Sequence, residues 1–286
     1  MKFLHRYINL LKLRCSVLEK TKAFFYVTLF YFLYVFKLEE IKFIKGILRL
    51  YDNNGRPLNV FGLNSSSRIY AFIEIFIDDC YNLCCGKKDK VLVFDLGANI
   101  GIFPIALYYF GWQPLFYVGV EPMPENLKLL YKNVGGLFNQ NEYLIIPMAL
   151  GEKSNSKKKF LYDYGSSRSL EYIDCVVLSN EKMIEVATIS FADFLKIVSS
   201  RITLNKPIFF KMDMEGGEWN IYEDLIKFLK EERNVKYIRG ELHFFKPGSS
   251  FESDIARFLD FIKDVFNYTH LQDAKGTVVS LSGIRK

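Results

Sequence analysis

The sequence predicts an α/β fold in which a doubly wound, mainly parallel sheet follows an N-terminal helical extension. Three observations predict it: strand-like and helix-like segments alternate from Val91 onward, a glycine turn follows the first strand, and residues 1–50 are basic and strongly apolar. With 286 residues, half of them apolar, the chain can form one large core and an extension. We expect a helical extension over 1–50, a hairpin and helix over 51–89, and the main domain over 90–286.

The positive charge of the chain lies mainly at its N-terminus. Residues 1–50 contain ten Lys and Arg and only three acids, whereas the other residues sum to −1 within a net charge of +6. A protein that binds nucleic acid carries a basic patch or stripe on the domain that makes the contact. The main domain has no such stripe, so we expect no nucleic-acid partner.

The extension also contains an uncharged, aromatic run, Ala23–Phe36. Its 14 residues fall short of the roughly 20 that a membrane-spanning helix needs. A helix packed on the protein or on a partner is therefore favoured, while peripheral membrane contact through residues 22–45 and a single span stay open. Five cysteines, two of them adjacent at Cys84 and Cys85, form no disulfide framework and indicate a reducing compartment. We expect a cytoplasmic protein, free or bound to the cytoplasmic face of a membrane.

Turn-forming and helix-capping residues predict a hairpin and a helix in the region before the main domain. The sequence DNNGR at Asp52–Arg56 favours a hairpin between strands at 47–51 and 58–63. The serines at 65–67 can cap a helix that extends over 68–83.

Strands and helices then alternate through the main domain, as βαβ units do. We expect strands at Val91–Gly97, Pro114–Pro122, Glu142–Leu150, Ile184–Ile189, Pro207–Glu215 and Val235–Phe244. We expect helices at Ile100–Phe110, Pro124–Val134, Phe191–Val198, Glu218–Lys230 and Glu252–Phe266. Lys153–Phe160 is expected to be an exposed polar segment, and Tyr268–Arg285 to form two strands with a turn at Lys275–Gly276. Ligands of such sheets bind at the carboxyl ends of the strands.

The sequence DLGANIG, Asp95–Gly101, joins the first of these strands to a helix. A nicotinamide-binding turn would carry a glycine in place of Asn99 and would hold a diphosphate. The acid Asp95 is unfavourable for a diphosphate and suits a zwitterionic ligand with cationic groups, such as the methionine part of S-adenosylmethionine. A strand-to-helix turn without a ligand is the alternative.

Acidic residues follow three further strands. Glu121 lies 24 residues after Gly97, where a carboxylate can accept hydrogen bonds from ribose hydroxyls. Asp213, Glu215 and Glu218 crowd the end of another strand, an arrangement that is unfavourable unless a ligand, a cation or a metal uses it. The helix dipole accounts for Glu218 but not for Asp213.

His243 ends the next strand, beside that cluster. It can act as a general base, a substrate contact or a metal ligand, or it can be structural. Mg²⁺ or Mn²⁺ held by Asp213, Glu215 and His243 is an alternative, but we expect no metal.

Six blocks in this order resemble the FkbM-type class I S-adenosylmethionine-dependent methyltransferases. They are VLVFDLGANIGIF, YVGVEPMPENLKLLYKN, IIPMALGEKS, EVATISFADFL, IFFKMDMEGGEW and GELHF, over about residues 90–245. The resemblance implies a Rossmann-like, seven-stranded sheet whose last strand is antiparallel. It places Asp95, Gly97, Ala98, Asn99 and Gly101 around the methionine end of the cofactor, Glu121 at the ribose, Met148 and Ala149 beside the adenine, and Asp213 at the cofactor amine or the substrate.

The resemblance further implies transfer of a methyl group from S-adenosylmethionine to a hydroxyl of a sugar, a glycan or a similar small molecule. Candidate catalytic residues are His243, Asp213 and Glu215, with the general base left open between His243 and Asp213. The alternatives are a nicotinamide-dependent oxidoreductase on a similar sheet and a non-catalytic, membrane-associated module that retains the fold.

Overall fold

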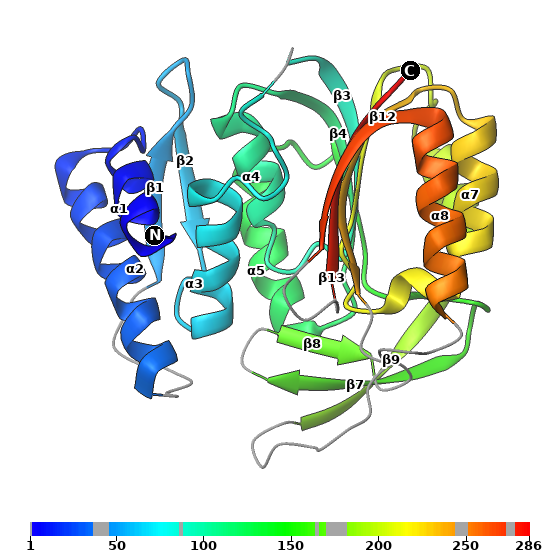
Figure 1. Cartoon of the computed structure of the whole chain (residues 1–286), viewed down its shortest axis with the longest axis horizontal. Coiled ribbons are helices and arrows are strands. Elements are labelled where there is room, and N and C mark those ends of the chain that lie inside the picture. The colour runs from blue at the N-terminus through cyan, green and yellow to red at the C-terminus, as the bar shows by residue number, and fades with distance from the viewer. Residues whose placement is uncertain are drawn as a thin grey trace.

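A seven-stranded sheet crosses the molecule, with helices on both faces (Figure 1). The computed structural model describes residues 2–36, 46–85, 88–163, 166–169, 182–243, 251–272 and 278–286. The strands of this sheet are β3 (Lys90–Leu96), β4 (Gln113–Val120), β5 (Tyr143–Ile146), β10 (Ile208–Met212), β11 (Val235–His243), β12 (Phe266–Gln272) and β13 (Val278–Arg285). Their order is β12-β13-β11-β10-β3-β4-β5. The five strands from β11 to β5 are parallel, and β13 is antiparallel to β11 and to β12. The predicted fold class is confirmed, including the antiparallel strand.

Each face of the sheet has its own apolar core. Along β3, Val91 and Val93 belong to one apolar cluster, while Leu92, Phe94 and Leu96 belong to the other. The first cluster includes α4 (Ile102–Tyr109) and α5 (Pro124–Gly135), and the second includes α6 (Phe191–Arg201), α7 (Tyr222–Glu231) and α8 (Phe251–Val265). Because both faces are covered, the central strands are apolar on both sides, as parallel sheets require.

The N-terminal residues pack onto the side that carries α4 (Figure 1). They form α1 (Lys2–Leu11), α2 (Val17–Phe36) and a hairpin of β1 (Ile47–Tyr51) with β2 (Pro57–Phe61). Leu10, Leu13, Ala23 and Val27 are buried in the same cluster as α4. This packing agrees with the favoured prediction for the uncharged run. Among the described residues, no helix combines the length and the apolar character needed to cross a bilayer. Residues 37–45 of the predicted membrane contact lie outside the described residues.

The helix expected over 68–83 is shorter and has two parts. Ser65 caps it by accepting a hydrogen bond from Arg68 N, and α3 (Ser66–Phe72) continues into the π-helix η1 (Ile73–Ile77). The wider π turn shifts the faces of the helix, so that Ile73 and Phe76 are buried while Glu74 faces a cavity. Such turns are frequent at functional sites.

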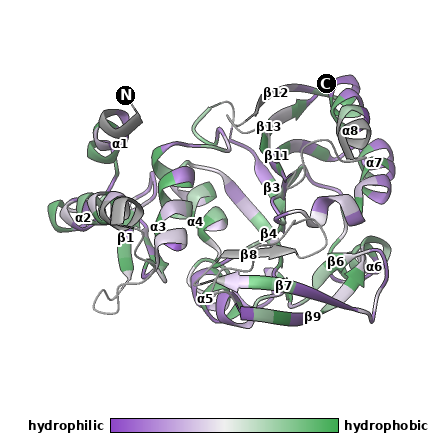
Figure 2. Ribbon diagram, turned by 60° about the horizontal axis from the view of Figure 1, so that its bottom comes forward, coloured by the Kyte–Doolittle hydropathy of each residue, from purple (hydrophilic) through white to green (hydrophobic). Residues whose placement is uncertain are grey.

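A second sheet lies beside the first and corrects two predictions. It contains β6 (Ala149–Gly151), β7 (Lys157–Asp163), β8 (Ser166–Ser169) and β9 (Lys182–Ser190), in the order β6-β9-β7-β8 (Figure 2). The single strand expected at 142–150 is wrong: β5 ends before Pro147, which lacks an N–H, and β6 pairs with β9 instead. The exposed segment expected at 153–160 is confirmed only in part: most of its residues are exposed, but β7 begins at Lys157, and Lys158 and Phe160 are buried.

The other helices and strands begin and end within a few residues of their predicted boundaries. The helix expected at 218–230 begins as the 3₁₀-helix η3 (Gly217–Asn220), after which α7 starts at Tyr222. The strands of the tail are β12 and β13, and the turn predicted between them lies outside the described residues.

Candidate active site

A cavity of about 830 Å³ lies at the carboxyl ends of β3, β4, β10 and β11, against α3 and η1. The site residues expected from the sequence divide into two groups. Gly97, Ala98, Asn99, Glu121, Ala149, Asp213 and Glu215 line the cavity, whereas Asp95, Gly101, Met148 and His243 lie outside its lining. Strands distant in the sequence therefore bring most of the predicted residues together.

The turn after β3 needs a glycine at position 97. Gly97 has φ +86°, and a Cβ there would lie 1.8 Å from the carbonyl oxygen of Asp213. The amides of Gly97 and Ala98 donate to the carbonyl of Val120 at 3.1 and 2.9 Å. The ends of β3, β4 and β10 are thus held close together at the floor of the cavity. Gly101, at φ +78°, starts α4 and does not reach the cavity.

Asp95 lies one layer below the cavity, where it holds a lysine. It is fully buried, accepts a hydrogen bond from Tyr117 Oη at 2.7 Å, and pairs with Lys211 Nζ at 3.1 Å. Burial raises the pKa of Asp95, and the ammonium of Lys211 opposes that rise. Lys211 Nζ also donates to the carbonyl of Gly97 at 2.6 Å. Asp95 therefore fixes the lysine that lines the cavity, whereas the resemblance placed Asp95 itself beside the ligand.

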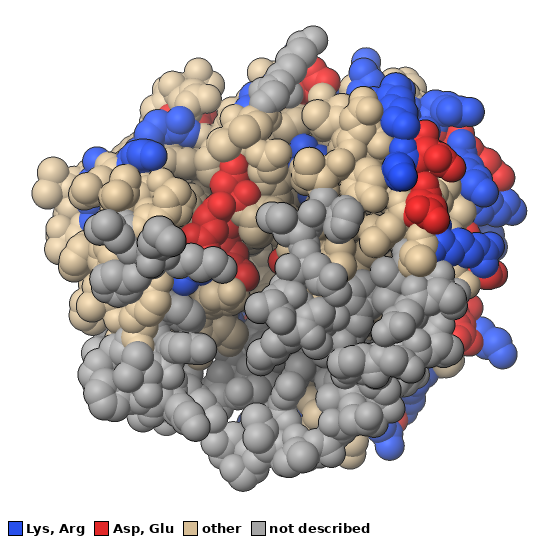
Figure 3. All heavy atoms as spheres, viewed as in Figure 1, with Lys and Arg blue, Asp and Glu red and all other residues tan. Residues whose placement is uncertain are grey.

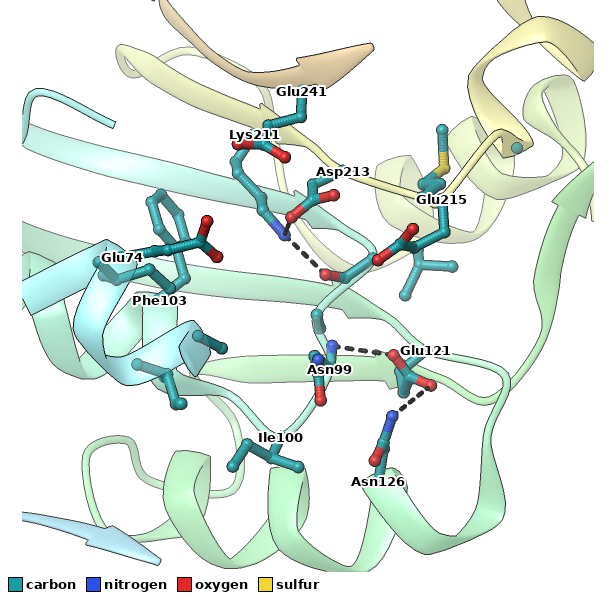
Figure 4. Close-up of a pocket in the computed structure, with 18 of the residues that line it drawn as sticks. Glu74, Asn99, Ile100, Phe103, Glu121, Asn126, Lys211, Asp213, Glu215 and Glu241 are labelled. Atoms are coloured by element: carbon teal, nitrogen blue, oxygen red, sulfur yellow. Dashed lines mark hydrogen bonds and ion pairs between the residues drawn. The ribbon is translucent and has the colours of Figure 1, made fainter. Parts of the chain in front are cut away.

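Glu121 stands at the end of β4 with both carboxylate oxygens engaged (Figure 4). Oε2 accepts from Asn99 N at 2.8 Å, and Oε1 accepts from Met123 N at 2.8 Å and from Asn126 Nδ2 at 3.4 Å. Burial nevertheless raises the pKa of Glu121 to about 7. Within the described residues, the buried Oδ1 atom of Asn99 has no hydrogen-bond partner. Asn99 Oδ1 is therefore an acceptor to which a ligand with hydroxyl or amino groups could donate a hydrogen bond.

The opposite wall of the cavity is acidic. Glu74, Asp213, Glu215 and Glu241 line it, and acidic side chains gather near the middle of the face seen in Figure 3. Burial raises the pKa of Glu74 to about 8 and that of Glu215 and Glu241 to about 7, and neighbouring carboxylates add to each rise. Tyr81 Oη donates to Asp213 Oδ2 at 2.8 Å. This wall suits a cation or a ligand with several hydroxyl groups.

His243 lies behind the acidic wall with carboxylates on both sides of its ring. Nδ1 is 3.4 Å from Glu218 Oε1, and Nε2 is 3.8 Å from both Asp213 Oδ1 and Glu215 Oε2. Burial lowers the pKa of His243, but Glu215 and Glu218 outweigh it and raise the pKa well above its ordinary value. Because His243 also lies outside the lining of the cavity, it is less well placed than Asp213 or Glu215 to take a proton from an acceptor in the cavity.

Glu218 has a structural role at this site. It is 1% exposed, and its carboxylate accepts hydrogen bonds from Met214 N at 2.7 Å and from Gly216 N at 2.9 Å. These bonds fix the loop after β10, on which Asp213 and Glu215 lie.

Three charged residues of the cavity were not predicted from the sequence. Glu241 stands two residues before His243, and alternate residues of a strand share a face, which could have identified it. Lys211 and Glu74 each interrupt an apolar run, in IFFKM and IEIFI, and such charges in buried elements are rare unless paired.

Comparison with known proteins gave one family match and several similar solved structures. A family model described as the methyltransferase FkbM domain matches residues 95–269. No curated protein matches the chain. Among solved structures, the FkbM methyltransferase from Methylobacillus flagellatus KT is 12% identical with a TM-score of 0.43, and the match covers 76% of this chain and 54% of that one. The O-methyltransferase from Bacillus cereus in complex with SAH is also 12% identical, with a TM-score of 0.41 and coverage of 73% and 81%.

The family match spans more than half of the chain and contains the glycine turn, Glu121 and three residues of the acidic wall, Asp213, Glu215 and Glu241. This chain therefore belongs to the FkbM methyltransferase domain family.

Proposed function

We propose that this protein transfers a methyl group from S-adenosylmethionine to a hydroxyl group of a sugar, a glycan or a similar polyhydroxylated small molecule. One observation carries the proposal: Gly97, Asn99, Glu121 and Asp213, from three strands, converge on a single cavity. A volume of about 830 Å³ lies in the upper part of the range of about 300–1,000 Å³ typical of small-molecule sites. It has room for a cofactor beside an acceptor.

The residues of the cavity fit the cofactor. Glu121 offers carboxylate oxygens to ribose hydroxyls, and the Asn99 Oδ1 atom can accept a hydrogen bond from the ligand. The absent side chain of Gly97 keeps the floor open, while Asp213 supplies negative charge near a cationic ligand. Lys211, held by Asp95, can neutralise a carboxylate of the ligand.

When bound, the cofactor supplies a methyl group already activated on a sulfonium, so the protein mainly aligns the two reactants, an effect worth roughly 7–11 kcal/mol. In the reaction the bond between methyl carbon and sulfur breaks, and a bond to the acceptor oxygen forms. The hydroxyl proton then needs an acceptor on the protein. We assign this role to Glu215, because its side chain lines the cavity and its partial burial among carboxylates raises its pKa toward the operating pH.

Isothermal titration with S-adenosylhomocysteine and with NAD tests the cofactor. We expect S-adenosylhomocysteine to bind and NAD not to bind. Glu121→Gln, which removes the charge but keeps the shape, should weaken S-adenosylhomocysteine binding about ten- to a hundredfold, since a hydrogen bond to a charged group contributes about 1.5–3 kcal/mol. Glu142→Gln, a change of an exposed carboxylate at the opposite end of β5, should leave the affinity unchanged. Binding of NAD alone would favour the oxidoreductase, and binding of neither would favour the non-catalytic module.

The affinity for S-adenosylhomocysteine should also rise with pH. The pKa of free Glu121 is raised to about 7, and ribose hydroxyls bind its ionised form. Below pH 7 binding must therefore release a proton, so the affinity at pH 6 should be about tenfold lower than at pH 8. Glu121→Gln should remove this part of the pH dependence while keeping the contributions of Glu74, Glu215 and Glu241. If the affinity of Glu121→Gln falls between pH 8 and pH 6 by as much as that of the unsubstituted protein, the assignment of Glu121 to the ribose is contradicted.

A further inference from the structure

Three side chains at the ends of β10 and β11 direct one donor atom each toward a common point. The donor atoms of Asp213, Glu241 and His243 all lie within 4.8 Å of one another. His243 Nε2 is 3.8 Å from Asp213 Oδ1 and 3.6 Å from Glu241 Oε2, both longer than a hydrogen bond. Donors around a small divalent ion stand about 3–3.5 Å apart when each lies about 2.1 Å from the ion. The three donor atoms would therefore have to move closer together to complete a coordination shell around an ion.

The histidine is oriented as metal-ligating histidines are. Its Nδ1 atom lies 3.4 Å from Oε1 of Glu218, a buried carboxylate that two backbone amides hold in place. With the hydrogen on Nδ1, the lone pair would be on Nε2, the ring nitrogen that lies 3.8 Å from Asp213 Oδ1 and 3.6 Å from Glu241 Oε2. A carboxylate behind the histidine, which sets its tautomer and its ring orientation, is the usual outer-shell partner of a metal ligand.

Each carboxylate likewise has one oxygen held from behind and one facing the common point. Tyr81 Oη donates to Asp213 Oδ2 at 2.8 Å, and Oδ1 is the atom nearest His243. Ser280 Oγ donates to Glu241 Oε1 at 3.3 Å, and Oε2 is the atom nearest His243. Each of the three donors therefore has a supporting group, as metal ligands in proteins usually do.

Among the described residues, negative charge exceeds positive charge around this point. Glu74 and Glu215 line the same wall, and Figure 4 shows the carboxylates of Asp213, Glu215 and Glu241 beside one another. Lys211, which also lines the cavity, pairs with Asp95 at 3.1 Å and donates to the Gly97 carbonyl, and its Nζ is 3.8 Å from Asp213 Oδ2. A divalent cation would balance these charges.

We propose that Asp213, Glu241 and His243 bind a divalent metal ion at the acidic wall of the cavity. Two carboxylates favour Mg²⁺ and Mn²⁺, and one imidazole favours a transition metal, so Mn²⁺ satisfies both. Asp213 and Glu241 line the cavity, so open coordination positions would face it. Two neighbouring hydroxyl oxygens of an acceptor can fill such positions, and this assignment of a vicinal diol, unlike the metal site itself, rests on the proposed function.

Titration of the chelator-treated full chain with Mn²⁺, followed through the electron paramagnetic resonance signal of free Mn²⁺, tests the site. We expect one bound ion per chain. Asp213→Asn and Glu241→Gln should each weaken Mn²⁺ binding at least tenfold. Tyr81→Phe, which keeps the ring but removes the hydroxyl behind Asp213, should weaken it about tenfold, as loss of an outer-shell partner does. Glu223→Gln removes an exposed carboxylate on α7 and should have no effect.

The outcomes separate the two proposals. Absence of stoichiometric Mn²⁺ binding, or binding that Asp213→Asn, Glu241→Gln and Tyr81→Phe leave unchanged, would overturn the metal site even if S-adenosylhomocysteine binds normally. Loss of S-adenosylhomocysteine binding with Mn²⁺ binding intact would instead count against the cofactor. Circular dichroism identifies variants that fail to fold, and the conservative Tyr81→Phe keeps the test decisive if Asp213→Asn does not fold.

Discussion

Gly97→Ala should lower the free energy of unfolding by about 3 kcal/mol or more. Two effects add up: the left-handed backbone at φ +86° disfavours alanine by roughly 1–2 kcal/mol, and its Cβ would lie 1.8 Å from the Asp213 carbonyl oxygen, which adds about 1–3 kcal/mol of overpacking. To relieve the overlap, the ends of β3 and β10 must separate, and the hydrogen bond from Asp213 N to the Leu96 carbonyl must lengthen. Urea unfolding followed by tryptophan fluorescence measures the loss.

Gly55→Ala is the matched control for this prediction. Gly55 also has a positive φ, +78°, but no atom lies within 4 Å of the position of its Cβ. Its substitution should therefore lower the free energy of unfolding only by the cost of a left-handed backbone at alanine, roughly 1–2 kcal/mol. If the two variants lose equal stability, the close approach of β3 and β10 at Gly97 does not hold.

Lys211→Met should destabilise the protein by about 3–5 kcal/mol, the usual result of leaving a buried charge without its partner. Asp95 is fully buried, and without the ammonium at 3.1 Å its carboxylate keeps only the hydrogen bond from Tyr117. Because the pKa of Asp95 is already raised by burial and would rise further, protonation should relieve the loss. The difference in free energy of unfolding between Lys211→Met and the unsubstituted protein should therefore become smaller as the pH falls from 8 to 5, as measured by urea unfolding at each pH.

Lys157→Met serves as the control, since Lys157 pairs with Glu185 at 2.7 Å on the surface, where such pairs contribute about 0–1 kcal/mol. A second check is the double variant Lys211→Met with Asp95→Asn, which removes the buried charge and should recover part of the stability. A loss in Lys211→Met no larger than in Lys157→Met would show that Asp95 does not depend on the lysine.

The local features of the fold could be predicted because their signals are local. The apolar run before Asp95, the glycine after it and the periodicity of the following helix are contiguous, and β3, its turn and α4 lie where they were expected. The split at Pro147 was missed, because periodicity alone does not show when a chain passes from one sheet to another. The strand β7 was missed because three consecutive lysines concealed the alternation of its faces.

The candidate site was predictable only in part. Glycines and acids at strand ends identified the floor of the cavity and Glu121. Glu74, however, reaches the cavity because a π-helix packs against the ends of distant strands, and no local pattern in residues 73–77 encodes that contact. The placement of Asp95 below the floor depends on Tyr117 and Lys211, which belong to neighbouring strands.

The lining of the cavity is drawn from segments as far apart in the sequence as Ser67 and Ser280. A fragment that lacks either segment therefore cannot form the whole lining, and a molecule bound there contacts parts of the chain that are synthesised far apart in time. Because such a ligand binds only the completed fold, its binding energy adds to global stability rather than to one loop. Occupancy would accordingly slow proteolysis throughout the molecule, including at bonds remote from the cavity.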